Sequence, residues 1–127
     1  MPELGVDPDT GGQTKYVIDL LAHLDGVQQV HRVDLLTRRI DDHRLSAAYA
    51  VDRERVGLKS QIVRIPCGPR GYIMKESLWP HLEEYIDRAI VYLREQPKLP
   101  DVLHGHYADG GLVASRIAKA LGIPFIF

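Results

Sequence analysis

Residues 101–127 read DVLHGHYADGGLVASRIAKALGIPFIF, and this stretch decides the fold class. An apolar strand over residues 101–106 runs into a loop, Asp109 precedes a helix, and Gly122 closes that helix before a last apolar strand, 123–127. One face of the helix is apolar and is formed by Val113, Ile117, Ala120 and Leu121. The order strand, helix, strand is typical of a parallel sheet with crossover helices.

The remainder of the chain continues this alternation. Apolar spacing predicts a helix of about three turns from Gly12, a strand over residues 30–37 and another over 62–65. A long helix is predicted over residues 78–93, and Pro80 is tolerated in its first turn. Because the strands are apolar on both faces, helices should cover both sides of the sheet. The sequence therefore predicts an α/β, Rossmann-like, doubly wound domain with a parallel sheet.

Three segments carry further structural expectations. Residues 38–60 are charged and weakly periodic, so we expect a surface excursion there with one helical turn at 45–50. Trp79 lies in the apolar stripe of the long helix, which favours core packing over a role as a ligand platform. The apolar run 123–127 should be a buried strand that something covers, and the chain opens on a polar loop. We therefore expect a fragment of a longer polypeptide.

Composition excludes several classes of protein. The 127 residues are 45% hydrophobic and 26% charged, which fits a single domain. Basic and acidic residues number 16 and 17, so the net charge of -1 disfavours nucleic acid as a partner. No apolar run approaches the roughly 20 residues of a membrane span, and the first residues lack a secretory pattern. With a single cysteine, Cys67, a cytoplasmic protein without a membrane partner is expected.

The first candidate site is Gly11-Gly12-Gln13, at the opening of a helix. Ligands of doubly wound sheets bind beyond the carboxyl ends of the strands, in loops of this kind. Free backbone N–H groups at a helix start favour anions, and the Gln13 amide suits sugar hydroxyls. A simple turn remains the alternative, and the incomplete G-x-G-x-x-G spacing disfavours a dinucleotide-binding dehydrogenase.

The other two candidate loops follow later strands. Arg70 and Lys75 are cations in a glycine-rich loop where they could clamp a phosphate, although a solvated lysine is an equal alternative for Lys75. His104 and His106 share a face, but no further ligand is spaced for zinc, so no metal site is expected. Asp109 either caps a helix or accepts hydrogen bonds from a sugar, with Tyr107 as a neighbouring donor.

No catalytic residue emerges from this pattern. A Ser-His-Asp arrangement cannot be assembled, and Cys67 has no neighbouring base in the sequence, so nucleophilic catalysis has no positive support.

Taken together, the chain resembles the sucrose-phosphate synthase family. The resemblance is carried, in this order, by segments within residues 2–17, 32–38, 67–80 and 100–109. Each segment is a weak signal alone, but their order and joint presence are specific. Sucrose synthases, the close relatives, usually differ over residues 104–109, which favours the phosphate-using enzyme.

The resemblance implies a retaining glycosyltransferase of two Rossmann domains (GT-B) that transfers glucose from UDP-glucose to fructose 6-phosphate, giving sucrose 6-phosphate. Residues 1–127 would be part of its amino-terminal, acceptor-side domain, and the carboxyl-terminal donor domain of the same polypeptide would lie outside them. Gly11, Gly12 and Gln13 would line the sugars and the donor diphosphate. Lys75 would hold the acceptor phosphate, and Tyr107 and Asp109 would contact fructose.

The same resemblance implies no tightly bound cofactor, with Mg2+ at most an activator. Front-face transfer needs no enzymic nucleophile, which agrees with the lack of one in the sequence. The isolated chain is expected to transfer no sugar. Two alternatives stay open: sucrose synthase or another sugar-phosphate glycosyltransferase of the same group, and a stand-alone phosphosugar-binding module.

Overall fold

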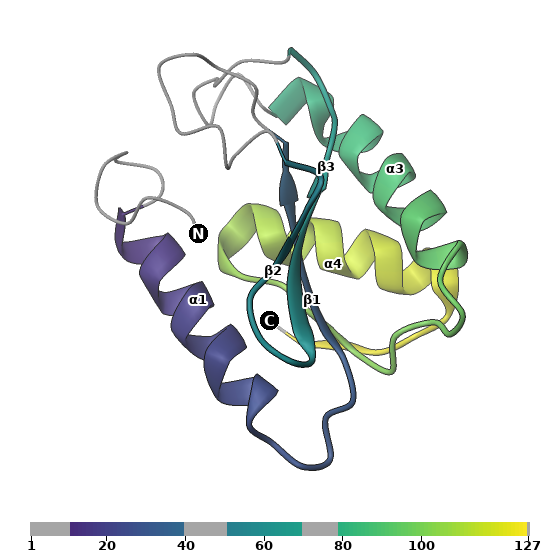
Figure 1. Cartoon of the computed structure of the whole chain (residues 1–127). Helices are drawn as coiled ribbons and strands as arrows, with labels where there is room; N and C mark the ends of the chain where they lie inside the picture. Colours follow the sequence, from purple (N-terminus) through teal and green to yellow (C-terminus); the bar gives the residue numbers. More distant parts are fainter. Residues whose placement is uncertain (1–10, 40–50, 70–78, 127) are drawn as a thin grey trace. The chain divides into compact units, whose positions relative to one another are not determined.

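The computed structural model describes residues 11–39, 51–69 and 79–126, and the chain divides into two units, Met1–Glu76 and Ser77–Phe127. The first unit contains α1 (Gly11–Asp25), β1 (Val33–Arg38), β2 (Arg53–Arg55) and β3 (Ser60–Ile65) (Figure 1). The second contains the 3-10 helix η2 (Trp79–His81), α3 (Leu82–Arg94), β4 (Leu103–His104), α4 (Tyr107–Leu121) and β5 (Phe125–Ile126). Within these described ranges, none of the helices has the length and apolar character to cross a membrane.

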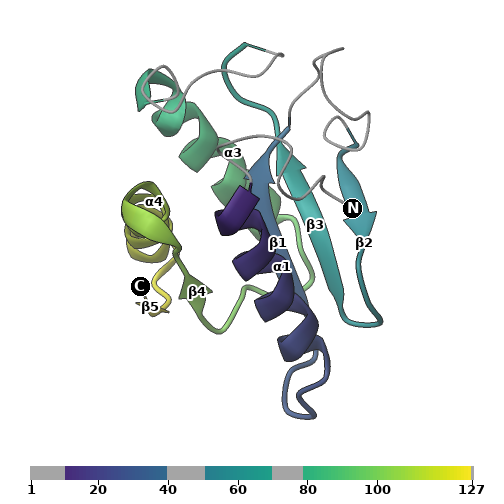
Figure 2. The same cartoon turned by 90° about the vertical axis from the view of Figure 1, so that its left-hand side faces the viewer.

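The sheet of the first unit has the strand order β1-β3-β2 (Figure 2). β1 and β3 are parallel over six residue pairs, from Val33 opposite Ser60 to Arg38 opposite Ile65. β2 pairs with β3 in the antiparallel direction, with Glu54 opposite Ile62. The prediction of a wholly parallel sheet is therefore right for β1 and β3 and wrong for β2.

Helix α1 and the sheet of the first unit share a hydrophobic core. Ile18 and Leu21 of α1 and Ile62 of β3 are buried together. Partly buried side chains of Val33, Leu35 and Val56 pack against this cluster. Burial is deepest on β3 because this strand is paired on both sides, and removal of its apolar surface from water stabilises the unit.

The strand β2 corrects the expectation of an excursion without sheet structure over residues 38–60. The sequence Arg53-Glu54-Arg55 has no apolar alternation that would indicate a strand. Tertiary pairing supplies what the local pattern lacks, because β3 offers a free ladder edge and a buried cation on that side. The helical turn expected at 45–50 lies outside the described residues.

The buried cation is Arg64, whose residue is only 3% exposed. Its guanidinium donates to the carbonyl of Val51 at 3.1 Å and forms an ion pair with Glu54 at 2.8 Å. The backbone N–H of Arg64 also donates to the carbonyl of Asp52 at 2.8 Å. These bonds satisfy a charge that would otherwise be costly to bury, and they hold β2 against β3.

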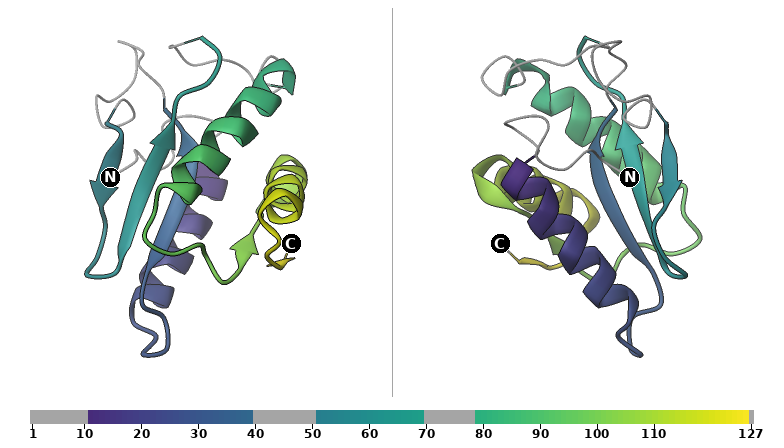
Figure 3. Two further views of the ribbon diagram at one scale, coloured as in Figure 1. Left: turned by 90° about the vertical axis from the view of Figure 1, so that its right-hand side faces the viewer. Right: turned by 60° about the vertical axis from the view of Figure 1, so that its left-hand side comes forward.

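The second unit is built on a strand–helix–strand motif, as the opening stretch predicts. β4 and β5 are parallel, with Leu103 opposite Phe125 and His104 opposite Ile126, and α4 connects them. Helices α3 and α4 lie against each other (Figure 3). The side chains buried on these two helices are Ile86, Ala89, Tyr92, Leu93, Ala114, Ile117 and Ala118. The predicted apolar stripe of α3 is thus confirmed. In α4 the helix is confirmed, but of its predicted apolar face only Ile117 is buried, while Ala120 is exposed.

The ends of α4 give one correct and one wrong prediction. Gly122 closes the helix in the left-handed conformation, with φ of 71°, and its N–H donates to the Ala118 carbonyl at 2.8 Å. The helix begins earlier than expected, at Tyr107, with His106 at the N-cap position. Asp109 is therefore the third residue of the helix and not its cap.

One prediction of burial is also wrong, and a second apolar segment is exposed. Trp79 is 53% exposed, because it belongs to η2, the short turn that precedes α3, and so lies outside the apolar stripe of that helix. In β5, Phe125 and Ile126 are 43% and 53% exposed. The strand itself was predicted correctly, and within the described residues its side chains are not buried.

Candidate functional site

One edge of the first unit brings together two of the three loops identified in the sequence. α1 runs opposite to β1 and β3, so the start of the helix and the carboxyl ends of both strands lie at the same edge (Figures 1 and 2). Gly11 and Gly12 form the first turn of α1, and residues 66–69 follow β3. Backbone N–H groups at a helix start carry partial positive charge, so this edge is suited to anionic ligands.

Arg38 ties the loop after β3 to the end of β1. Its Nε donates a hydrogen bond to the carbonyl of Cys67 at 3.0 Å, and one of its terminal nitrogens donates to the carbonyl of Pro69. Gly68 between them has a φ of 62°, a conformation that side chains rarely adopt. A single guanidinium thus donates hydrogen bonds to the residues before and after the left-handed Gly68. We call residues Cys67–Pro69, held in this way, the clamped loop.

The next residue along the chain, Arg39, makes different contacts and does not take part in this one. Arg39 instead forms an ion pair with Asp52 at 2.9 Å, while its backbone N–H continues the ladder to the Ile65 carbonyl at 2.9 Å. Inside the clamped loop, the side chain of Cys67 is buried. The clamped loop is therefore anchored in the unit by Cys67, while Gly68 and Pro69 are exposed.

In the second unit, the turn between β4 and α4 depends on close backbone approach. A Cβ on Gly105 would lie 2.8 Å from the carbonyl carbon of Gly110 and 3.0 Å from Cβ of Ala114. The N–H of Gly105 also donates to the Ile126 carbonyl at 2.9 Å. Only glycine fits here without a shift of the backbone, and its fit places His106 at the start of α4.

The two histidines of this turn lie against each other. Their ring centroids are 4.2 Å apart and the planes are inclined by 32°. Burial, and next the nearby His104, lower the pKa of His106 below its ordinary value of 6.5. His106 is then uncharged at neutral pH, so its ring can both accept and donate a hydrogen bond. Among the residues that the structure describes, His, Cys, Asp and Glu form no cluster of three or more that could hold a metal ion.

The predicted site residues fall into three groups. Gly11, Gly12 and Gln13 lie in the first turn of α1, and Tyr107 and Asp109 lie in the first turn of α4. The side chains of Gln13, Tyr107 and Asp109 are outside the described part of the chain, as are Arg70 and Lys75 altogether. The structure thus brings Gly11 and Gly12 to the same edge as the clamped loop, and it leaves the individual binding roles as predictions.

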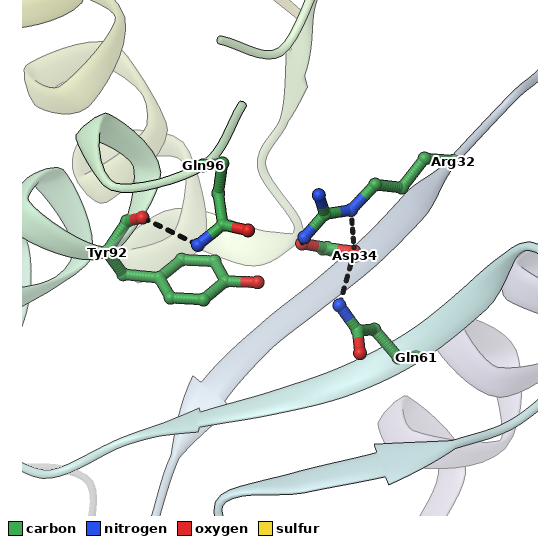
Figure 4. A network of polar contacts seen from close by, with 5 residues as sticks. All are labelled: Arg32, Asp34, Gln61, Tyr92 and Gln96. Atoms are coloured by element: carbon green, nitrogen blue, oxygen red, sulfur yellow. Dashed lines mark hydrogen bonds and ion pairs between the residues drawn. The ribbon is translucent and has the colours of Figure 1, made fainter. Parts of the chain in front are cut away.

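Other polar contacts of the first unit lie at the opposite ends of β1 and β3. Asp34 accepts hydrogen bonds from Arg32, at 3.1 and 2.9 Å, and from Gln61 at 3.1 Å (Figure 4). Asp25, the last residue of α1, accepts from the Lys59 N–H at 2.9 Å and from the Ser60 hydroxyl at 2.6 Å. These contacts join α1 and the strands far from the candidate edge, so they stabilise the unit.

A comparable local contact occurs in the second unit, where the side chain of Gln96 donates to the Tyr92 carbonyl at 3.0 Å (Figure 4). Gln96 lies just after the end of α3, and its bond supplements the one that the Glu95 N–H donates to the same carbonyl at 3.2 Å.

Arg38 is the residue of this edge to which the sequence analysis gave no role. It was assigned to the surface excursion that follows the predicted strand 30–37, and nothing in its neighbourhood along the chain indicates a contact with residues 29 and 31 positions further on. The signal that was available is the Cys67-Gly68-Pro69 sequence, because glycine and proline indicate a turn, although they do not indicate which side chain contacts it.

Comparisons of the sequence with known proteins identify its relatives. Residues 11–127 match the glycosyl transferase 4-like domain. The chain is 45% identical over 145 aligned residues to sucrose-phosphate synthase 4 of Arabidopsis thaliana, and 41% identical over 149 to sucrose-phosphate synthase of Zea mays. It is 40% identical over 152 to probable sucrose-phosphate synthase 4 of Oryza sativa subsp. japonica. Each alignment covers 98% of this chain and 14% of the relative, so the chain spans about a seventh of their length.

Proposed function

Because the chain belongs to the glycosyl transferase 4-like family, we propose that it is the acceptor-side part of an enzyme that transfers glucose from UDP-glucose to fructose 6-phosphate. The product would be sucrose 6-phosphate. The observation that carries the proposal is the identity of 40% to 45% with proteins named sucrose-phosphate synthase, which extends over 98% of the chain. A two-Rossmann-domain enzyme acting in the cytoplasm is part of the same proposal.

The candidate edge of the first unit supports a ligand with phosphate groups. The first turn of α1 offers N–H groups from Gly11 and Gly12, and the absence of side chains there lets a ligand approach the backbone closely. We assign these residues, with Gln13, to the sugars and the donor diphosphate. Lys75, further along the chain from the clamped loop, is assigned to the acceptor phosphate, where an ammonium group would pair with its charge.

The turn between β4 and α4 supports a role in binding a sugar. The uncharged ring of His106 can both donate and accept a hydrogen bond, which suits the hydroxyl groups of a sugar. Tyr107 and Asp109 follow in the first turn of α4, and we assign them to hydroxyls of the fructose moiety.

The proposed chemistry needs no nucleophile from this chain. A hydroxyl oxygen of fructose 6-phosphate forms a bond to the anomeric carbon of glucose while the bond from that carbon to UDP breaks. The hydroxyl proton passes to the departing UDP phosphate on the same face of the sugar, so the configuration is retained. The contribution of this chain is to orient the acceptor and to stabilise negative charge with backbone N–H groups and cations.

The test is a chimera in which residues 1–127 replace the segment that they match in the Zea mays relative. With UDP-glucose and fructose 6-phosphate, we expect sucrose 6-phosphate as the product. Lys75→Ala should raise the KM for fructose 6-phosphate, while Lys98→Ala, at an exposed lysine paired with Asp101, should not. A folded chimera that prefers free fructose as the acceptor would favour a sucrose synthase, and one without transferase activity would contradict the proposal.

The isolated chain gives a second, independent readout. We expect it to bind fructose 6-phosphate weakly and to transfer no glucose, because most donor contacts are assigned to the domain outside these residues. Titration followed by NMR, with fructose and with inorganic phosphate as controls, would measure this. Binding of inorganic phosphate as tight as that of fructose 6-phosphate would argue against a sugar-phosphate site.

A further inference from the structure

Arg38 lies at the candidate edge, and its side chain donates hydrogen bonds to the backbone of the clamped loop at the same edge. We propose that Arg38 is a positioning residue for the acceptor, which acts by holding the clamped loop in the geometry that acceptor binding requires. This inference rests on the proposed function for the identity of the ligand. The clamp itself rests on the two hydrogen bonds from Arg38 to the carbonyls of Cys67 and Pro69.

The chemistry of the clamp explains why arginine occupies this position. The two carbonyls flank Gly68, and a planar guanidinium presents several N–H donors in a fixed fork that can reach both at once. A lysine ammonium is a point charge on a flexible stem, so we expect it to donate a well-aligned hydrogen bond to only one of the two carbonyls. Donation from a charged group is also stronger than a neutral hydrogen bond. The Arg38 side chain alone can therefore hold the conformation of the left-handed turn at Gly68.

The place of the clamp links it to binding. Arg38 is the last residue of β1 and lies opposite Ile65, the last residue of β3. The clamped loop therefore begins where both parallel strands end, at the edge that also holds the first turn of α1. A displacement of about 1 Å in a group that positions substrate can reduce turnover about a hundredfold, so a held loop has functional value.

Cys67 provides a direct reporter of the clamp. It is the only cysteine of the chain and is 5% exposed, so a thiol reagent reaches it only when the loop opens. Loss of hydrogen bonds from a charged donor should favour the open loop, and we expect Arg38→Ala to accelerate labelling roughly ten- to a hundredfold. Arg38→Lys should lie between Arg38→Ala and the unaltered chain.

Arg39→Ala is the matched control for the labelling experiment. Its ion pair with Asp52 is exposed and does not involve the clamped loop, so labelling of Cys67 should keep its original rate. Thermal unfolding of each variant, measured alongside, shows whether labelling reports local opening. If Arg38→Ala does not fold, Arg38→Lys carries the comparison. Equal labelling rates in the folded Arg38 variants and the unaltered chain would overturn the clamp.

The chimera tests whether the clamp serves the acceptor. Arg38→Ala should raise the KM for fructose 6-phosphate about tenfold or more and leave the KM for UDP-glucose near its original value. Arg39→Ala, the control, should change neither KM. A purely structural role would instead reduce the amount of active enzyme and leave both KM values unchanged. That outcome, in an active chimera, would overturn the inference alone. An inactive unaltered chimera would overturn the proposed function and with it the acceptor role of Arg38.

Discussion

The two units of this chain both contain a parallel pair of strands, but the pairs differ threefold in length. β1 and β3 pair over six residues, whereas β4 and β5 pair over two. In the first unit the strand ladder is the framework on which α1 rests. In the second unit the ladder is so short that packing of α3 and α4 and the close turn at Gly105 must define the structure. A parallel pair of strands is thus stabilised by different interactions in the two units.

The largest effect is expected in the ladder of the first unit. Ile62 is 1% exposed at the centre of β3, so Ile62→Ala should lower the free energy of unfolding by about 2–5 kcal/mol through lost burial and a cavity. Urea denaturation measures this, and hydrogen exchange should show β1 and β3 losing protection. Leu58→Ala, at a side chain that is 92% exposed, should change stability by less than about 0.5 kcal/mol. Equal losses from both variants would mean that β3 is not the framework.

A pair of glycine substitutions tests the turn of the second unit. Gly105→Ala should cost about 1–3 kcal/mol, because the new methyl group would push against the backbone of α4. At Gly110 the nearest atom to an added Cβ is 3.6 Å away, an ordinary contact, and the residue is helical. Gly110→Ala should therefore be neutral or stabilise by up to about 1 kcal/mol. Thermal unfolding measures both, and a loss of stability in Gly110→Ala similar to that in Gly105→Ala would remove the distinction.

The link between α1 and the sheet should depend on pH. Hydrogen bonds from the Ser60 hydroxyl and the Lys59 N–H lower the pKa of Asp25 below its ordinary value of 3.8. The unfolded chain therefore binds this proton more readily, and stability rises with pH across the interval between the two pKa values. The contribution is complete above the unfolded pKa and is lost as the pH falls through the folded pKa.

Asp25→Asn isolates this contribution. The unaltered chain should be more stable than Asp25→Asn at pH 7, and the gap should close as the pH drops below about 4. Urea midpoints between pH 3 and pH 7 measure it. Asp101→Asn, which removes a carboxylate from an exposed pair with Lys98, is the control for general charge effects. A gap that stays constant with pH would show that geometry and not charge matters at Asp25.

The smallest effect is expected at the surface of the second unit. Arg116 and Glu83 form an ion pair between α4 and α3 at 2.8 Å, with both side chains largely exposed. Glu83→Gln should lower the unfolding temperature slightly at low salt and hardly at all in 1 M salt, where the screening length is about 3 Å. Glu84→Gln, whose pair with Arg88 is looser at 3.7 Å and lies within α3, should have less effect still. A loss that persists at high salt would assign the pair a larger role in holding the two helices.

Periodicity predicted the helices and the parallel strands well, because these features are local. The stripe through Ile86, Ala89 and Leu93 indicates a helix whatever it packs against. The failures concern residues whose state depends on distant partners. β2 forms because its backbone pairs with β3 and because Glu54 pairs with the buried Arg64. Trp79 is exposed because α3 starts only at Leu82.

In the candidate site, too, local features were predicted from the sequence and a contact between distant residues was not. The sequence identified the loops, since double glycines and histidines after strands are visible along the chain. It also identified the family resemblance, which the identity of 40% to 45% with sucrose-phosphate synthases and the match to the glycosyl transferase 4-like domain confirm. Arg38 was missed because its partners are 29 and 31 residues away. A contact of that separation leaves no periodic signal.

By itself, then, the sequence determined the alternation of strands and helices, the loops that follow the strands and the family. The tertiary structure decided the antiparallel third strand, the true start of α4 at Tyr107, the exposure of Phe125 and the clamp on the loop after β3. The physical reason is that local patterns record which surfaces of an element are apolar. Hydrogen bonds and burial between distant segments depend on where the chain brings those surfaces together.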